Sequence, residues 1–344
     1  EELEKIRTRK RNYTPWQVAI GAGFACGGFC IQFGCDWMAF LYASIAAIIG
    51  MRVRAKCNES GLNHYMGIAI SAFIATMLAW ASTLLPAEWT STPWHPLLAC
   101  ALFIVPGVPL INFVDDMLDN YIQVGIVRAV NTLLMVSAMA FGIAFAVKLC
   151  SIGDFFPTIS MVPHHNYLEY AIAAAISAMG FSMIFNIQRR LLWVVAIGGI
   201  IAVCTRNFVN LGPSTNNIGL DMGLVIGSFS GSVLVSLIAI KAVHWFHVPN
   251  HVLTIPSVIP MIPGVLMYRM LFGLINMNVQ SIDQVTPLMK AIESGVNSGL
   301  VIMCIALGVA IPNIFGRKYI ASSKNKRLAE ILKERKARGK FVEW

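Results

Sequence analysis

Residues Leu102–Asn131 read LFIVPGVPLINFVDDMLDNYIQVGIVRAVN, a stretch in which a helix break and several charges lie within apolar sequence of membrane-spanning length. Pro106, Gly107 and Pro109 interrupt the helix, because a proline lacks the backbone N–H and clashes with the preceding turn. In hydrocarbon, the backbone groups freed by a break need protein or a water-filled cavity to satisfy them. The stretch therefore predicts a functional cavity at this break.

Polar side chains follow the break closely, and ionisable groups inside a membrane usually mark functional sites. Asn112 and Asp116 are four residues apart and share a helix face with Pro109, whereas Asp115 lies on another face. We expect Asp116 to face the cavity and to carry a proton, since desolvation raises the pKa of a carboxyl group. The alternative is an acidic turn at the membrane surface that pairs with Arg128.

A second break lies in the segment IPSVIPMIPGVLMYR, which ends at Arg269 and contains the break residues Pro260, Pro263 and Gly264. Arg269 follows its proline-glycine pair at the same distance at which Asn112 follows the first. A guanidinium there would bind a substrate carboxylate through two hydrogen bonds; the alternative is an arginine that anchors the membrane interface. Two interrupted segments at corresponding positions of two halves are typical of a secondary transporter's binding site.

The composition indicates a multispanning membrane protein. Of 344 residues, 57% are hydrophobic and 12% charged, and soluble domains have about 25% charged residues. The net charge of +9 comes from basic residues at the termini and in short connections, which argues against a nucleic-acid partner. The eight cysteines form no C-x-x-C pair, and motifs of hydrolases, metalloproteases and ATPases are absent. We therefore expect no enzymatic activity and no cofactor.

Apolar runs of about 20 residues predict ten transmembrane helices in two groups of five. The expected spans are Trp16–Phe33, Trp37–Val53, Met66–Leu85, Leu97–Leu118, Ile126–Leu149, Tyr167–Ile187, Leu191–Phe208, Gly219–Ile240, Val252–Ile275 and Val285–Phe315. The expected domains are a cytoplasmic segment 1–15, a first repeat 16–150, an external linker 151–166, a second repeat 167–315 and a basic cytoplasmic tail 316–344.

Basic residues alternate between the two sides of this topology. They cluster in the N-terminal segment, after the second span, at Arg189–Arg190 and in the tail, which predicts that both termini are cytoplasmic. Five spans per half would insert the second half upside down. Short matches at constant order support this inverted repeat: Gly28-Phe29 with Gly180-Phe181, and Pro106-Gly107-Val108 with Pro263-Gly264-Val265.

The histidines offer alternatives that we consider weaker. His244, His247 and His251 invite a metal site, but Pro249 separates the last of them and no carboxylate accompanies them in sequence. His165 lies in the expected outer linker, where nothing nearby in the sequence suggests a catalytic role. No metal ligand set is therefore predicted.

The two broken segments resemble the bacterial threonine/serine exporter family. The resemblance rests on PGVPLIN, on the spacing of Asn112 and Asp116 with Gly125 and Arg128 after them, and on VPNHVLTIPSVIPMIPGVLMYR. It implies a ten-span exporter of small hydrophilic amino acids in the bacterial inner membrane, driven by the proton motive force. The family usually has a cytoplasmic region before the first span and commonly a glycine where this chain has Asp119 or Asn120.

We therefore expect a secondary exporter of threonine or serine that works by alternating access and is coupled to protons. Exporters of small dicarboxylates such as succinate, which the resemblance also includes, remain an alternative, as does a channel for small solutes. The expected partners are the substrate, protons and the lipid bilayer. Substrate identity, coupling stoichiometry and a homo-oligomeric state stay open.

Overall fold

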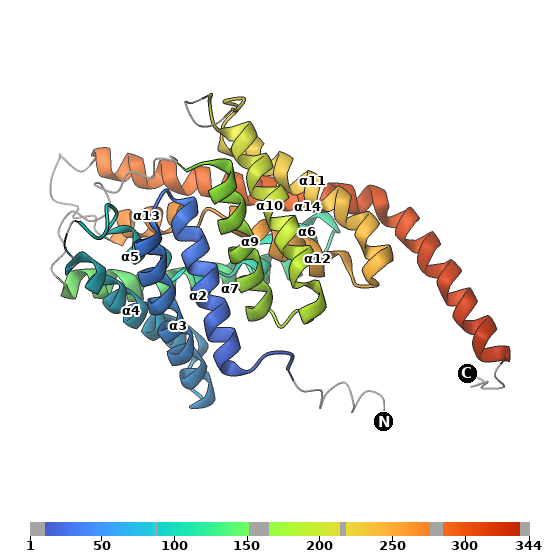
Figure 1. Cartoon of the computed structure of the whole chain (residues 1–344), viewed down its shortest axis with the longest axis horizontal. Coiled ribbons are helices and arrows are strands. Elements are labelled where there is room, and N and C mark those ends of the chain that lie inside the picture. The colour runs from blue at the N-terminus through green and yellow to red at the C-terminus, as the bar shows by residue number, and fades with distance from the viewer. Residues whose placement is uncertain are drawn as a thin grey trace.

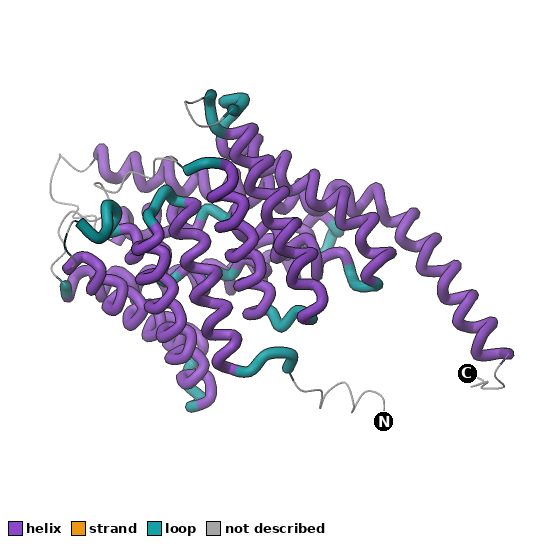
Figure 2. Tube along the Cα trace, in the orientation of Figure 1, coloured by secondary structure: helices purple, strands orange, loops and turns teal. Residues whose placement is uncertain are grey.

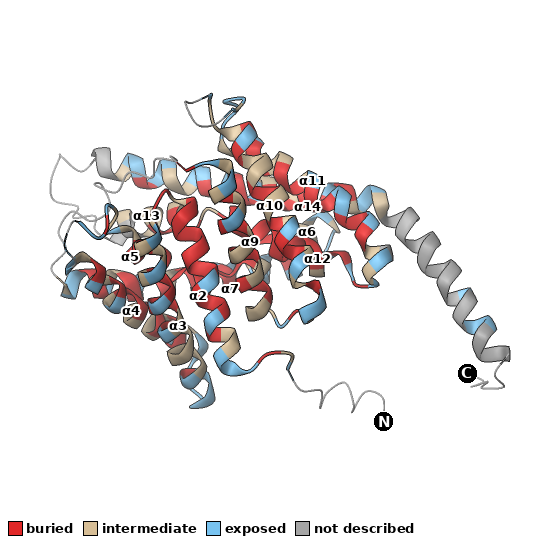
Figure 3. Ribbon diagram, in the orientation of Figure 1, coloured by how far each residue is buried: buried red, intermediate tan, exposed pale blue. Residues whose placement is uncertain are grey.

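The computed structural model of the chain describes residues 11–84, 86, 88–150, 165–213, 218–275 and 285–337. In this part of the chain, helices and short 3-10 turns are the only regular elements, as Figure 2 shows. The expectation of an all-α fold is confirmed. Figure 3 shows buried positions mainly where helices meet and exposed positions on the outer faces, and many of the exposed residues are large and apolar, as expected for a bundle in lipid.

Each half contributes the same series of helices (Figure 1). The first half contains α2 (Pro15–Gln32), α3 (Trp37–Glu59), α4 (His64–Trp80) with the 3-10 turn η1 (Ala81–Leu84), α5 (His95–Ala99), η2 (Leu102–Ile104), α6 (Gly107–Leu118) and α7 (Ile122–Leu149). The second contains α9 (Tyr167–Ile184), η3 (Arg189–Leu191), α10 (Leu192–Asn210), α11 (Leu224–Phe246), α12 (Asn250–Val258), η4 (Ile259–Met261), α13 (Gly264–Ile275) and α14 (Val285–Ala337).

In the part of the chain that the structure describes, seven helices are long and apolar enough to cross a membrane, or nine if each of two bent pairs counts as one span. The bent pairs are His95–Ile104 with Gly107–Leu118 and Asn250–Met261 with Gly264–Leu271, each bent by 56°. Both predicted breaks are therefore confirmed. Helix α2, the first of the ten predicted spans, is not among the nine, so the count of ten stays a prediction.

One predicted start is wrong. Helix α11 begins at Leu224 rather than at Gly219, because Gly223 has a φ of 87° and ends the preceding loop. The last predicted span, Val285–Phe315, agrees with the apolar part of α14, Leu288–Gly316, and α14 continues as a helix to Ala337. The predicted basic tail starts within this helix, since its lysine, arginine, glutamate, alanine and leucine residues are strong helix formers.

The two halves meet where α2 packs against α9. A Cβ on Gly28 would lie 2.6 Å from the carbonyl oxygen of Ala173, whereas a Cβ on Gly21 would lie 2.8 Å from Cβ of Met183. Residue numbers therefore rise along α2 as they fall along α9, so the two helices are antiparallel. Both contacts need glycine, because any side chain would separate the backbones.

Residues that match between the halves contact one another at this crossing. Ser177 Oγ donates a hydrogen bond of 3.2 Å to the carbonyl oxygen of Ala25, and these positions differ by 152. Phe29 and Phe181, which have the same offset, stack edge to face with 5.8 Å between ring centroids. Contacts between equivalent positions are expected where two units are related by a two-fold axis.

The two breaks also contact each other. A Cβ on Gly107 would lie 2.9 Å from Cδ1 of Ile262 and 3.1 Å from Cγ1 of Ile259. A Cβ on Gly264 would lie 2.5 Å from Cδ2 of Leu102 and 3.5 Å from Cγ2 of Val105. The contact is reciprocal, because each glycine packs against the segment that precedes the other one. The breaks thus lie side by side in the core.

A buried histidine forms a hydrogen bond between the second half and the first. His165 Nε2 donates a 2.8 Å hydrogen bond to the carbonyl oxygen of Cys35, and His165 Nδ1 lies 2.9 Å from Glu169 Oε2. Asp36, next to Cys35, caps α3 by accepting 2.7 Å hydrogen bonds from the N–H groups of Ala39 and Ser91. His165 therefore has a structural contact that the sequence did not predict.

Candidate functional site

A cavity of about 430 Å³ lies where α6 ends, α7 begins and α12 begins. It is open to the surface on one side and contains the polar side chains of α6 and α7 that follow the first break. Apolar side chains from the end of α9 and from α12 complete its walls. The lining residues are Val108, Asn112, Asp115, Asp116, Arg128, Phe185, Ile187, His251, Val252, Ile255 and Pro256.

Asp116 and Arg128 form an ion pair in this cavity. Arg128 Nη1 donates to Asp116 Oδ2 at 2.5 Å, and the side chains are 44% and 21% exposed, respectively. The turn between α6 and α7 makes this pair possible, because Asn120 adopts a left-handed φ of 67° and reverses the chain. Arg128 is therefore positioned by Asp116 while part of its guanidinium faces the open cavity.

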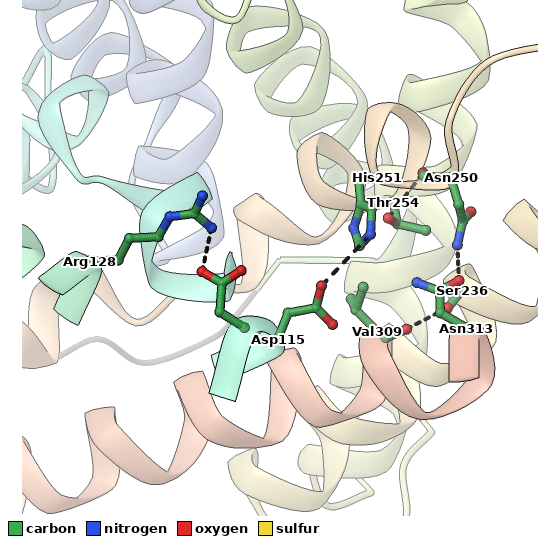
Figure 4. Close-up of polar contacts among 9 residues, drawn as sticks. Asp115, Arg128, Ser236, Asn250, His251, Thr254, Val309 and Asn313 are labelled. Atoms are coloured by element: carbon green, nitrogen blue, oxygen red, sulfur yellow. Dashed lines mark hydrogen bonds and ion pairs between the residues drawn. The ribbon is translucent and has the colours of Figure 1, made fainter. Parts of the chain in front are cut away.

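Asp115 lies beside this pair and faces a histidine from the other half. His251 Nε2 is 3.8 Å from Asp115 Oδ2, and Figure 4 shows the two pairs next to each other. Asp115 was predicted as a site residue on a helix face other than that of Asn112 and Asp116. It lines the cavity as well, because the first turn of α12 approaches the face of α6 that carries Asp115.

Beneath His251, polar groups link α12 to its neighbours. The amide nitrogen Nδ2 of Asn250 donates to Oδ1 of Asn313 on α14, and Thr254 Oγ1 donates to the carbonyl oxygen of Asn250 at 3.1 Å. Ser236 Oγ on α11 donates to the carbonyl oxygen of Val309 at 2.9 Å (Figure 4). The Asn250–Asn313 bond therefore links the first turn of α12, next to His251, to α14, and the Ser236–Val309 bond links α14 to α11.

The arrangement combines both signs of charge within one small space. Two carboxylates and one guanidinium give a formal charge of −1 when His251 is neutral and zero when it is protonated. A molecule with one carboxylate and one ammonium group would find a partner for each. Because half-exposed charges are hydrated, such a cavity can exchange its internal ion pairs for pairs with a bound ion at small net cost.

The predicted site residues fall into three groups. Asn112, Asp115, Asp116 and Arg128 line the cavity together. Gly107 and Gly264 lie at the contact between the two broken spans, and the predicted prolines lie on or next to these elements; they are Pro106, Pro109, Pro260 and Pro263. Arg269 lies on α13, beyond the second break, and is not among the cavity residues.

Sequence reasoning missed His251 as a site residue. It was weighed only as a metal ligand, and the described residues contain no group of three His, Cys, Asp or Glu that could hold a metal ion. The repeat offered a signal: His251 comes just before the second break, and in an inverted repeat the start of one broken span lies at the same membrane side as the end of the other. Phe185 and Ile187 carried no comparable signal.

Comparison with protein families gives two matches that together cover most of the chain. Residues 1–150 match the family described as putative threonine/serine exporter. Residues 170–315 match the family described as threonine/serine exporter ThrE. One polypeptide therefore contains both of these family domains, one after the other.

Curated relatives match one part of the chain at low identity. A protein from Klebsiella aerogenes named probable succinate transporter subunit YjjP is 28% identical over 137 residues, which are 40% of this chain and 53% of that protein. The protein of the same name from Escherichia coli strain K12 is 29% identical over the same length. The chain spans about half the length of these relatives. No solved structure matches the chain.

Proposed function

Because the chain belongs to the threonine/serine exporter family, we propose that it is a secondary exporter of small zwitterionic amino acids. The observation that carries this proposal is the cavity of about 430 Å³ in which Asp115, Asp116 and Arg128 lie together. A cavity of this size suits a small solute. Its charges of both signs suit a molecule that has a carboxylate and an ammonium group.

In the bound state, Arg128 binds the substrate carboxylate, because a guanidinium forms two parallel hydrogen bonds with a carboxylate. Asp116 gives up its 2.5 Å contact with Arg128 and accepts the substrate ammonium instead, together with Asp115. The amide of Asn112 is available to a side-chain hydroxyl such as that of threonine or serine. Each polar group of the substrate then has a partner within the cavity.

Proton coupling follows if a proton and the substrate ammonium compete for Asp116. An ionised Asp116 binds the ammonium, whereas a protonated Asp116 is neutral and binds it more weakly. The proton and the substrate ammonium therefore occupy Asp116 in turn, as antiport requires. His251 is 3.8 Å from Asp115 and balances the remaining negative charge when it is protonated.

Alternating access is supported by the relation between the halves. The two breaks pack reciprocally and α2 runs antiparallel to α9 through equivalent residues, which is the arrangement expected of inverted five-helix repeats. The cavity at the end of α6 then has an equivalent on the opposite side of the membrane, near Arg269 on α13. We propose that rocking of the halves about the paired breaks opens one side at a time, in an inner membrane with both termini cytoplasmic.

Dicarboxylate transport is the second candidate, because the curated relatives are named probable succinate transporter subunits. The charges of the cavity favour an amino acid over succinate. Two carboxylates already face a single guanidinium, so a second substrate carboxylate would lack an arginine partner. A like charge about 4 Å away costs on the order of 4 kcal/mol at an effective dielectric constant of about 20.

Transport by the purified protein in proteoliposomes tests both candidates. We expect uptake of labelled threonine and serine against their gradients when a pH difference is imposed, and little uptake of succinate. Asp116→Asn should abolish this accumulation but retain exchange of threonine between equal compartments, because the amide keeps its size but binds no proton. Accumulation by Asp116→Asn under a pH difference would show that protons couple elsewhere, and uptake of succinate in preference to threonine would favour the second candidate.

A further inference from the structure

An apolar groove of about 180 Å³ lies between α10, α11 and α12, separate from the cavity that contains Asp116. Its walls are aliphatic and aromatic, apart from Ser257, whose hydroxyl donates to the carbonyl oxygen of Leu253 at 2.7 Å. The groove residues are Trp193, Val194, Ile197, Gly198, Ile201, Val235, Ile238, Ala239, Ala242, Trp245, Phe246, Leu253 and Ser257. A groove on the surface of transmembrane helices faces lipid, so the acyl chains of the bilayer can reach it.

Aromatic side chains mark one end of the groove. Trp193, at the start of α10, is 56% exposed, and Trp245, near the end of α11, is 75% exposed. The ring of Trp193 stacks edge to face on Phe246 with 5.6 Å between centroids, so these two helix ends lie at the same level. Exposed tryptophans gather where the hydrocarbon meets the headgroups. This end of the groove therefore lies at a membrane interface.

From that interface the groove extends into the hydrocarbon. It follows α10 from Trp193 to Ile201, eight residues on, which corresponds to a depth of about 12 Å at a rise of about 1.5 Å per residue. One leaflet of a bilayer has a hydrocarbon depth of about 15 Å. The groove thus matches the depth of a single acyl chain in one leaflet.

Two cations lie at the same end. Arg190 is exposed and lies one turn before Val194, and Lys241 is exposed and shares a face of α11 with Ile238 and Trp245. Arg190 donates to Oε1 of Gln188 at 2.8 Å, a neutral partner that leaves its charge uncompensated by this contact. Lys241 lies one turn below Trp245 and can extend its amine to the headgroups along its aliphatic stem.

We propose that this groove binds one acyl chain of an anionic phospholipid whose phosphate contacts Arg190 and Lys241. An apolar groove of leaflet depth with cations at its mouth matches both parts of such a lipid. A zwitterionic lipid offers the same chain without net negative charge, so the cations give the site its selectivity. Basic residues near a membrane surface attract anionic lipids in this way.

The position of α12 gives this site a consequence for transport. Leu253 and Ser257 line the groove, whereas His251 and Ile255 line the candidate substrate cavity, so the same half-helix separates the two. A chain in the groove packs against the back of α12 and favours the arrangement in which His251 faces Asp115. This second step rests on the proposed function, whereas lipid binding by itself does not.

Native mass spectrometry of the purified full chain tests the binding step with phosphatidylglycerol and phosphatidylcholine. We expect phosphatidylglycerol to bind more tightly, and the double variant Arg190→Gln/Lys241→Gln to lose on the order of 25-fold in affinity for it, at about fivefold per cation. The matched control Lys148→Gln/Lys290→Gln removes two exposed lysines away from the groove and should bind like wild type. Equal binding by both double variants would overturn the proposal.

Fluorescence locates the chain independently of the cations. Phosphatidylglycerol with brominated acyl chains should quench the tryptophan emission of the wild type. The quenched part of the emission should be smaller in Trp193→Phe/Trp245→Phe. Unchanged quenching in that variant, or a dimer that excludes the lipid and places a second copy in the groove, would overturn the proposal. If lipid binds but transport rates do not depend on phosphatidylglycerol, the binding site stands and its effect on α12 is refuted.

Discussion

Arg128→Gln removes the guanidinium that we propose to bind the substrate carboxylate and leaves a shorter, neutral amide. In the free protein, Arg128 contacts Asp116 at 2.5 Å, so the substrate must replace an existing partner. The variant therefore loses the hydrogen bonds to the substrate, which weakens binding. It also has no ion pair with Asp116 to break, which favours binding. The net effect on affinity is the difference between these two contributions.

Their sizes follow from the exposure of the two side chains. A hydrogen bond to a charged group contributes about 1.5–3 kcal/mol. With Asp116 21% and Arg128 44% exposed, the internal ion pair contributes about 1 kcal/mol or less. The difference is about 1–2 kcal/mol, so Arg128→Gln should weaken threonine affinity by about 5- to 30-fold.

Counterflow of labelled threonine in proteoliposomes measures this change as KM without an imposed gradient. Arg128→Lys keeps the charge but loses the planar fork, and we expect a KM between those of wild type and Arg128→Gln. Lys148→Gln removes a lysine that lies outside the cavity and serves as the control. A threonine KM in Arg128→Gln equal to that of wild type, at equal amounts of folded protein, would refute the binding role of Arg128.

Further predictions concern the helix contact at Gly180, the helix cap at Asp36 and Arg269 in the second half. Gly180→Ala should lower the Tm of the detergent-solubilised protein, with a cost of about 1–3 kcal/mol, because a Cβ would lie 3.0 Å from Cα of Ala25; Gly299→Ala, where nothing lies within 4 Å, should not. Burial raises the pKa of Asp36, but hydrogen bonds from Ala39, Thr90 and Ser91 outweigh it and lower the pKa below 3.8. Asp36 therefore stabilises the fold above that pH, and the Tm difference between wild type and Asp36→Asn should close as the pH falls through the lowered pKa. Arg269→Lys should weaken the affinity for threonine measured from the membrane side opposite the cavity. An unchanged threonine affinity on that side would leave Arg269 as an interfacial anchor.

The sequence by itself determined the local features of this protein. Prolines and glycines at Pro106-Gly107 and Pro263-Gly264 predicted both breaks, because proline removes a backbone donor wherever it occurs in a helix. The matches Gly28-Phe29 and Gly180-Phe181 supported a repeat, and the structure places these residues where α2 crosses α9, which the sequence did not predict. Helix periodicity likewise placed Asn112 and Asp116 on one face, and both line the cavity.

The tertiary structure alone decided which groups meet. Periodicity relates positions along one helix but contains no information on which neighbour approaches which face. Asp115 lines the cavity because α12 packs on its side of α6, and His251 joins it from more than 100 residues further along the chain. Arg269 follows the second break at the distance at which Asn112 follows the first, but it lies on α13, outside this cavity. Membership of the candidate site therefore depends on the packing between the halves, which no local pattern specifies.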